Sequence, residues 1–353
     1  MPELTAQFEA ALRNIEPTVA DKENAPLAHA AVSDALAGDP VIAGWGFSPL
    51  LIGSYKRHVS IRRVKDVDVF CRLTELEDGV KPGVLLTEFE RVLKKEFPGA
   101  GDQLRVKRQA RSLQVGFEEY DGLYVDAVPA RPWLSPTGLE AWQVPKREER
   151  DDEQGWQATN PHGLTELTTA LNGADQFDEY YVPTVKLLRQ TRRSLMGNKK
   201  PGGLTVEIAA LHAFQSGLVQ GPTRADYYVS ALRQTGNVLH NAFVLGFGLD
   251  DPTLPGEKIV VRGTDETKEE LAATFLDAAT QAEEALAKGA DGDEKCAAAK
   301  IFRDLLGKAV DDVGDNDYVF PMPDVCNLDG TAKKFSGVSA GDSFVPAGNR
   351  RFG

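Results

Sequence analysis

Two aspartates stand one residue apart at the start of an alternating apolar stretch, DVDVFCRL, which runs from Asp66 to Leu73. The alternation predicts a half-buried β-strand, in which residues i and i+2 point to the same face. Asp66 and Asp68 would then present two carboxylates side by side. Because like charges repel, such a pair indicates a site for divalent cations with oxygen ligands, above all Mg²⁺.

A third acid lies in a later apolar segment, YVDAV, which also reads as a strand. Asp126 would be costly to bury there unless it is paired or bound to a metal. If the two strands are neighbours, three carboxylates converge, and this is the ligand set of a two-metal site for phosphoryl transfer. An Asp-x-Asp alone is more often a solvated strand face or a turn, so the prediction depends on all three acids.

Upstream of these acids, Gly53 and Ser54 follow a short apolar run and begin a turn. Glycine lets the backbone approach a phosphate, and Ser54 adds a hydroxyl and an N–H. The chain has a net charge of −13, which argues against a protein that coats nucleic acid. A basic run inside an acidic chain indicates a local pocket for an anionic ligand. The five cations between the turn and the acids are Lys56, Arg57, Arg62, Arg63 and Lys65.

The order of patterns predicts an α+β fold. After a helical lead-in comes strand–helix–strand–strand–strand, which fits a mixed sheet backed by helices, and from about residue 160 the patterns are helical. We expect a catalytic lobe with N-terminal helices over 1–155, a helical lobe over 156–320 with a central cleft between the two, and a flexible C-terminal tail over 321–353.

The three cysteines, Cys71, Cys296 and Cys326, are odd in number and far apart. This spacing indicates neither a zinc site nor a disulfide framework. The N-terminal segment lacks the apolar core of a signal peptide, and no apolar run is long enough to span a membrane. We therefore expect a cytoplasmic protein with no membrane partner.

The combined pattern resembles a known superfamily. Gly53-Ser54, then eleven residues, then Asp66-Val67-Asp68 and the later Asp126, is similar to the signature of DNA polymerase β-like nucleotidyltransferases. The later segments VPTVKLLRQTRR, GGLTVEIAALHAF and LDDPTLPGEKIVV resemble bacterial cyclic GMP-AMP synthase/DncV-like nucleotidyltransferases (CD-NTases). The similarity covers roughly residues 1 to 325.

This resemblance implies an enzyme that binds nucleoside triphosphates (NTPs) between a polymerase β-like lobe and a helical lobe. It would join them into a cyclic di- or trinucleotide messenger in anti-phage (CBASS-type) signalling. Asp66, Asp68 and Asp126 would hold two Mg²⁺ ions, for which Mn²⁺ can substitute, and Asp126 would help to activate the acceptor hydroxyl. Gly53 and Ser54 would hold the donor triphosphate.

Two features of the helical lobe bear on triphosphate binding. Lys186 matches the family's helical lysine that reaches the phosphates; without the resemblance it reads as an exposed lysine on an arginine-rich helix. Many relatives carry a serine four residues before a glutamate, whereas here Gly203 stands before Glu207. Thr205, or backbone N–H groups, would then replace that serine. The zinc-binding insertion of the animal DNA-sensing relative is missing, so double-stranded DNA sensing is not expected.

Other functions remain open on the sequence alone. A linear oligonucleotide synthetase or a nucleotide-adding toxin would use the same lobe, and a catalytically quiet nucleotide-binding scaffold would need no acids. The resemblance also suggests an operon-encoded regulatory partner, or one that conjugates the C-terminal Gly353 to a target.

Overall fold

The computed structural model describes residues 4–99, 104–146, 155–173, 177–309 and 317–334. The helices are α1 (Thr5–Ile15), α2 (Val19–Ala37), α3 (Pro40–Gly44), α4 (Gly53–Lys56), α5 (Pro82–Glu96), α6 (Pro161–Leu171), α8 (Tyr181–Met196), α9 (Gly203–Gln215), α10 (Arg224–Phe243), α11 (Asp265–Ala287) and α12 (Gly292–Leu306). The strands are β1 (Phe47–Ile52), β2 (Asp66–Leu73), β3 (Val106–Arg108), β4 (Leu113–Phe117), β5 (Leu123–Leu134), β6 (Glu140–Pro145) and β7 (Trp156–Thr159).

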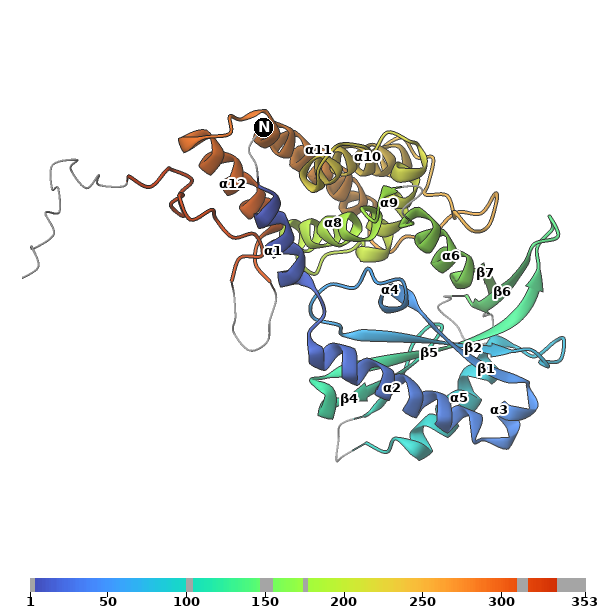
Figure 1. The fold of residues 1–353 in the computed structure, drawn as a ribbon. Helices are drawn as coiled ribbons and strands as arrows, with labels where there is room; N and C mark the ends of the chain where they lie inside the picture. Colours follow the sequence, from blue (N-terminus) through green and yellow to red (C-terminus); the bar gives the residue numbers. More distant parts are fainter. Residues whose placement is uncertain (1–3, 100–103, 147–154, 174–176, 310–316, 335–353) are drawn as a thin grey trace, which may run out of the picture.

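The strands form a mixed sheet with the order β1-β2-β5-β4-β3, and β6 pairs with β5 and β7. β2 and β5 run parallel, whereas β1–β2, β4–β5 and β3–β4 are antiparallel. Figure 1 shows α2, α3 and α5 on the side of the sheet away from the helical region. This architecture confirms the α+β prediction, although the sequence patterns missed β6 and β7 and the full length of β5.

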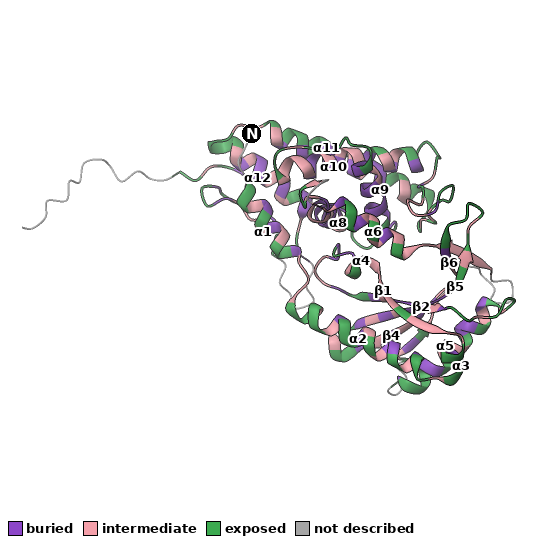
Figure 2. Ribbon diagram, turned by 45° about the vertical axis from the view of Figure 1, so that its right-hand side comes forward, coloured by how far each residue is buried: buried purple, intermediate pink, exposed green. Residues whose placement is uncertain are grey.

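The sheet and the helical region have separate cores. One apolar cluster joins α2 and α5 to the sheet, with Val32, Phe89 and Val69 among its buried members. The larger cluster fills the helical bundle around α8, whose residues are mostly buried (Figure 2). The longer helices bury apolar residues that recur at helical spacing, as in α1, α5 and α10, which is why periodicity predicted them.

The first helix belongs to the helical core. Phe8 of α1 is fully buried and lies 5.8 Å from Tyr228, 5.0 Å from Phe302 and 5.2 Å from Phe320, measured between ring centroids. The expectation for 1–155 grouped this helix with the catalytic lobe, because a local pattern cannot show which core an amphipathic helix meets. The other boundaries, 156–320 and 321–353, remain a proposal.

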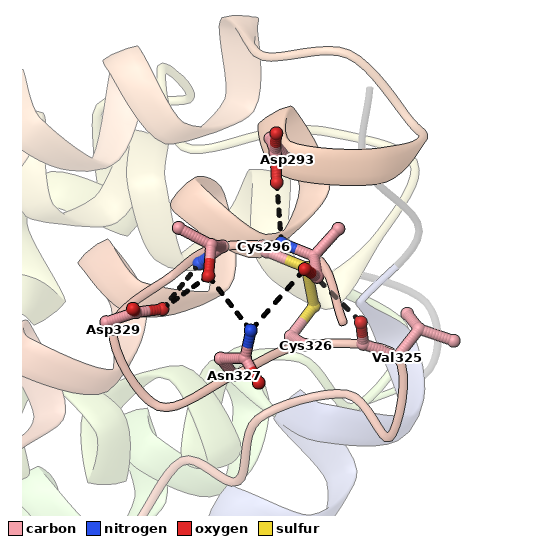
Figure 3. The surroundings of a disulfide bond; sticks show 8 residues. Asp293, Cys296, Val325, Cys326, Asn327 and Asp329 are labelled. Atoms are coloured by element: carbon pink, nitrogen blue, oxygen red, sulfur yellow. Dashed lines mark hydrogen bonds between the residues drawn. A yellow bond between two sulfur atoms is a disulfide. The ribbon is translucent and has the colours of Figure 1, made fainter. Parts of the chain in front are cut away.

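A disulfide fastens the segment after the last helix. Cys296 of α12 and Cys326 are bonded with their Cα atoms 5.3 Å apart (Figure 3). Nearby, Asp293 Oδ1 accepts a hydrogen bond from the N–H of Ala332 at 2.6 Å. The prediction of no disulfide was wrong, because the pairing depends on how a segment 30 residues away packs on α12. Gly353 and the rest of 335–353 lie outside the described residues.

Across the described ranges, no helix has both the length and the apolar character needed to cross a lipid bilayer.

The disulfide predicts a redox-dependent stability. We expect replacement of both Cys296 and Cys326 by Ser to lower the free energy of unfolding by roughly 2–4 kcal/mol, because the unfolded chain regains the entropy of the closed loop. Denaturant titration measures this change. A reductant should destabilise the wild type and leave the double variant unaffected. An unchanged wild-type midpoint, with both thiols shown to be free, would contradict the prediction.

Candidate active site

Neighbouring strands bring the three predicted acids together. Asp66 and Asp68 lie on β2 and Asp126 lies on β5, and Asp68 pairs in register with Asp126. Asp66 is two residues before Asp68, so both lie on the same face of the strand. The condition on which the sequence prediction depended is therefore met, since β2 and β5 are adjacent and parallel.

Burial and repulsion between charges oppose the ionisation of Asp68 and Asp126. Burial, followed by the negative charges of Asp66 and Asp126, raises the pKa of Asp68 to about 7, and Arg57 offsets part of this rise. Burial and then Asp66 raise the pKa of Asp126 to about 6, which Arg262 opposes. Clustered carboxylates with too little compensating positive charge form a site that a bound dication would stabilise.

The predicted Gly53-Ser54 turn lies directly beside the acids. Ile52, the last residue of β1, pairs with Asp68, and Gly53 begins α4 with a φ of +81°. A Cβ at position 53 would lie 2.0 Å from Oδ2 of Asp68. Both the left-handed conformation and this close approach require glycine.

Ser54 lies at the edge of the cleft and is held by the residues that follow α4. Its Oγ is 3.0 Å from Oγ of Ser60. Its carbonyl accepts hydrogen bonds from the N–H groups of Val59 at 3.0 Å and Ser60 at 3.2 Å. Ser54 and Ser60 both line the cleft.

A cleft of about 460 Å³ lies between the sheet and the helical bundle. Residues from both sides line it, and basic side chains outnumber acidic ones. Such a surface concentrates and orients anionic ligands. The charged lining residues are Arg63, Lys65, Asp66, Arg189, Arg192 and Arg193.

The arginines of α8 are crowded. Burial, followed by repulsion from Arg189, lowers the pKa of Arg192 and lowers that of Arg193 to about 10. Arg192 is fixed by hydrogen bonds to the carbonyls of Gly197 at 2.7 Å and Pro201 at 3.0 Å. A polyanion bound in the cleft would reduce the repulsion between these cations, just as a bound dication would reduce the repulsion between the acids.

Lys186 lies outside the cleft. It is buried, its Nζ pairs with Glu16, and it does not line the described cleft, whereas Arg189 three residues later does. A phosphate contact by Lys186 remains a prediction that would require release from Glu16. Sequence reasoning did not select Arg189, although its place three residues after Lys186 on an arginine-rich helix could have indicated it. No sequence signal revealed the pairing with Glu16.

Glu207, which served only as a reference point in the sequence, joins the two sides of the cleft. It is fully buried in α9 and pairs with Arg57 at 2.5 Å and with Arg189 at 3.2 Å. Thr205, the expected substitute for the family's serine, is buried and does not line the described cleft, whereas Gly203 does. Sequence reasoning missed this network because Arg57 and Glu207 are 150 residues apart.

Residues 3–172 match the family model of the SMODS domain, the Second Messenger Oligonucleotide or Dinucleotide Synthetase domain. No curated protein matches the chain.

Several solved structures share the fold over most of the chain. One is the Escherichia coli MS115-1 CdnC in its complex with HORMA-deltaN, with a TM-score of 0.63 and 17% identity over 88% of this chain and 98% of that one. The Bradyrhizobium diazoefficiens CD-NTase CdnG with GTP has a TM-score of 0.60 and 15% identity, covering 80% and 91%. The Rhodothermus marinus CdnE c-UMP-AMP synthase with Apcpp and Upnpp has a TM-score of 0.60 and 18% identity, covering 82% and 99%. Residues 3–172 therefore belong to the SMODS domain family of CD-NTases, and most of the chain shares the fold of solved CD-NTases.

The acids of this site fit Mg²⁺ by their chemistry, since carboxylate oxygens are the protein ligands that Mg²⁺ prefers. Over the described residues, no group of three or more His, Cys, Asp or Glu side chains is arranged to hold a metal ion, so the ligand set is not preformed. Magnesium usually takes one or two carboxylates together with water and substrate phosphates, and it does not require a complete protein cage. Asp66, Asp68 and Asp126 are the residues that would hold it.

Gly53→Ala tests the contact between the turn and the acids. We expect it to abolish most nucleotidyl transfer, because the added methyl group would displace the Asp68 carboxylate. Gly138→Ala is the matched control, since Gly138 has a φ of +82° but nothing within 4 Å of an added Cβ. Initial rates and melting temperatures of both variants separate backbone strain from the clash. Equal activity in the two variants would contradict the prediction.

The raised pKa of Asp68 predicts linked pH and Mg²⁺ effects. Because its pKa rises from 3.8 to about 7, the folded state binds this proton more tightly than the unfolded chain. The resulting stability is complete below about pH 4 and is lost as the pH rises from about 4 to 7. Mg²⁺ binds the ionised form, so we expect it to raise the melting temperature more at pH 8 than at pH 5.

We expect Asp68→Asn to weaken both the pH dependence of stability and the stabilisation by Mg²⁺. In metal-free buffer, the variant should lose less stability than the wild type between pH 4 and pH 7, and Mg²⁺ should shift its melting temperature less. Thermal unfolding with EDTA or with Mg²⁺ measures the difference. An equal Mg²⁺ shift in both proteins would show that Asp68 does not contribute to the ion site.

Proposed function

We propose that this CD-NTase joins NTPs into a cyclic di- or trinucleotide in a Mg²⁺-dependent reaction. The observation that carries the proposal is the register pairing of Asp68 with Asp126 beside a cleft lined by arginines. Phosphoryl transfer needs carboxylate-held metal at the reacting phosphate and cations along the remaining phosphates. The family's description as an oligonucleotide or dinucleotide synthetase domain supports this chemistry, as does the GTP bound to the neighbour CdnG.

The donor triphosphate would lie along the cleft. Gly53 lets the backbone approach the phosphates, and Ser54 offers its hydroxyl and N–H. Arg189 and its neighbours on α8 would bind phosphate oxygens, for which the planar guanidinium fork is well suited. Lys65 adds a point charge on the opposite side of the cleft.

Asp126 would accept the proton of the acceptor hydroxyl. Without metal its pKa of about 6 leaves it mostly ionised at neutral pH, so it is ready to bind Mg²⁺. When bound, Mg²⁺ neutralises the charge that develops on the transferring phosphoryl group. Asp66, which lines the cleft, and Asp68 would orient the ion.

The biological setting is also a proposal. We place the enzyme in the cytoplasm in CBASS-type anti-phage signalling, with a regulatory protein as a partner. The HORMA complex of the neighbour CdnC supports a partner of this kind. Conjugation of Gly353 to a target remains a prediction, and no double-stranded DNA sensing or membrane partner is proposed.

Substitution of the acids tests the activity. Asp66→Asn and Asp126→Asn should each reduce pyrophosphate release from NTPs with Mg²⁺ by about a hundredfold or more, because each removes a metal ligand. Asp304→Asn on the surface of α12 is the control and should retain full activity. Unchanged release in either active-site variant would overturn the proposed mechanism. A wild-type protein that binds NTPs without releasing pyrophosphate would favour a quiet scaffold.

A linear oligonucleotide synthetase or a nucleotide-adding toxin would also release pyrophosphate. These functions differ from the proposed one in the ends of the product, and digestion with phosphatase and nuclease separates them.

A further inference from the structure

Glu207 binds two arginines that come from different lobes. Its Oε1 accepts a hydrogen bond from Nε of Arg57 at 2.5 Å, and its Oε2 accepts one from Nη2 of Arg57 at 3.1 Å. Oε2 also accepts a hydrogen bond from Nη1 of Arg189 at 3.2 Å. The carboxylate is fully buried, so its one negative charge is shielded from solvent and is shared by the two cations.

Arg57 connects Glu207 to the Gly53-Ser54 turn. It lies three residues after Ser54, its N–H donates to the carbonyl of Gly53 at 3.2 Å, and it is 5% exposed. It also interacts electrostatically with Asp68. Through Arg57, α9 of the helical lobe is therefore fixed to the turn beside the acid cluster.

Arg189 extends the same network into the cleft. Its side chain lines the cleft, and its Nε has no hydrogen-bond partner within the described chain. A Cβ at position 203 would lie 3.1 Å from Cζ and Nη2 of Arg189. The guanidinium thus packs directly over Gly203, where a side chain would disturb it, and its Nε is a buried donor without a hydrogen-bond partner.

We infer that Glu207 is a positioning residue for the donor triphosphate, because it holds Arg189 in the cleft and ties it to the Gly53-Ser54 turn of the other lobe. This inference rests on the proposed function, which supplies the phosphate ligand. Arg57 and Arg189 repel each other, so the two guanidinium groups would separate without the shared carboxylate. The network leaves one net positive charge beside the cleft, which suits a phosphate.

Glu207→Gln removes the charge and keeps the shape of the side chain. The Kd for inorganic tripolyphosphate with Mg²⁺, and the KM for the consumed NTP, should each rise by about tenfold or more. The kcat should stay within about threefold, because ground state and transition state lose the same phosphate contact. A purely structural role would lower the melting temperature and the active fraction without changing KM or Kd. Calorimetric titration and initial rates give these values.

Glu283→Gln is the matched control for this experiment. Glu283 pairs with Arg233 between α11 and α10, and its side chain is 47% exposed. Removing its charge should leave both the tripolyphosphate Kd and the NTP KM unchanged.

Gly203→Ala is the second probe, since loss of a buried ionic partner can unfold a domain. It leaves every charge in place but brings a methyl group against the Arg189 guanidinium. We expect the tripolyphosphate Kd to rise about threefold or more with an unchanged melting temperature. Gly44→Ala, with nothing within 4 Å of the added Cβ, should bind as the wild type does.

The outcomes separate the two claims. Wild-type affinity for tripolyphosphate in folded Glu207→Gln, or in Gly203→Ala, would overturn the positioning role. If both variants bind tripolyphosphate weakly but the wild type releases no pyrophosphate from NTPs, the positioning role stands and the proposed synthase function fails.

Discussion

The parallel pairing of β2 with β5 sets Asp68 beside Asp126, and the remaining features of the site follow from the repulsion this creates. Carboxylates this close and this buried resist ionisation, so the folded apoprotein retains protons at a pH where free aspartate has lost them. A dication delivered with a nucleotide would exchange for those protons. Gly53 belongs to the same arrangement, because any side chain there would collide with Asp68.

The second half of the site carries the opposite charge and comes from another part of the chain. Three arginines of α8 crowd the helical side of the cleft, and burial together with repulsion from a neighbouring arginine lowers the pKa of each. The acid cluster and the arginine cluster are each unfavourable alone, and a Mg²⁺–triphosphate complex would stabilise both. Glu207 couples the two halves, because its buried carboxylate pairs with one arginine from each lobe.

Local spacing was enough to predict part of this site. Asp66, Asp68 and the Gly53-Ser54 turn lie within one segment, and alternation along a strand fixes which side chains share a face. Whether Asp126 lies near Asp66 and Asp68 depends on the order of the strands in the sheet. That order was predicted from the family resemblance and not from local spacing. The pairing of Lys186 with Glu16 and that of Cys296 with Cys326 arise from tertiary packing between distant segments, which no local pattern encodes.

Mass spectrometry of the product formed from all four NTPs with Mg²⁺ tests the central claim most directly. The account predicts a phosphatase-resistant product whose mass equals two or three nucleoside monophosphates less one water for each linkage, including the one that closes the ring. A product that keeps a terminal phosphate and is shortened by phosphatase would contradict the cyclic synthase assignment.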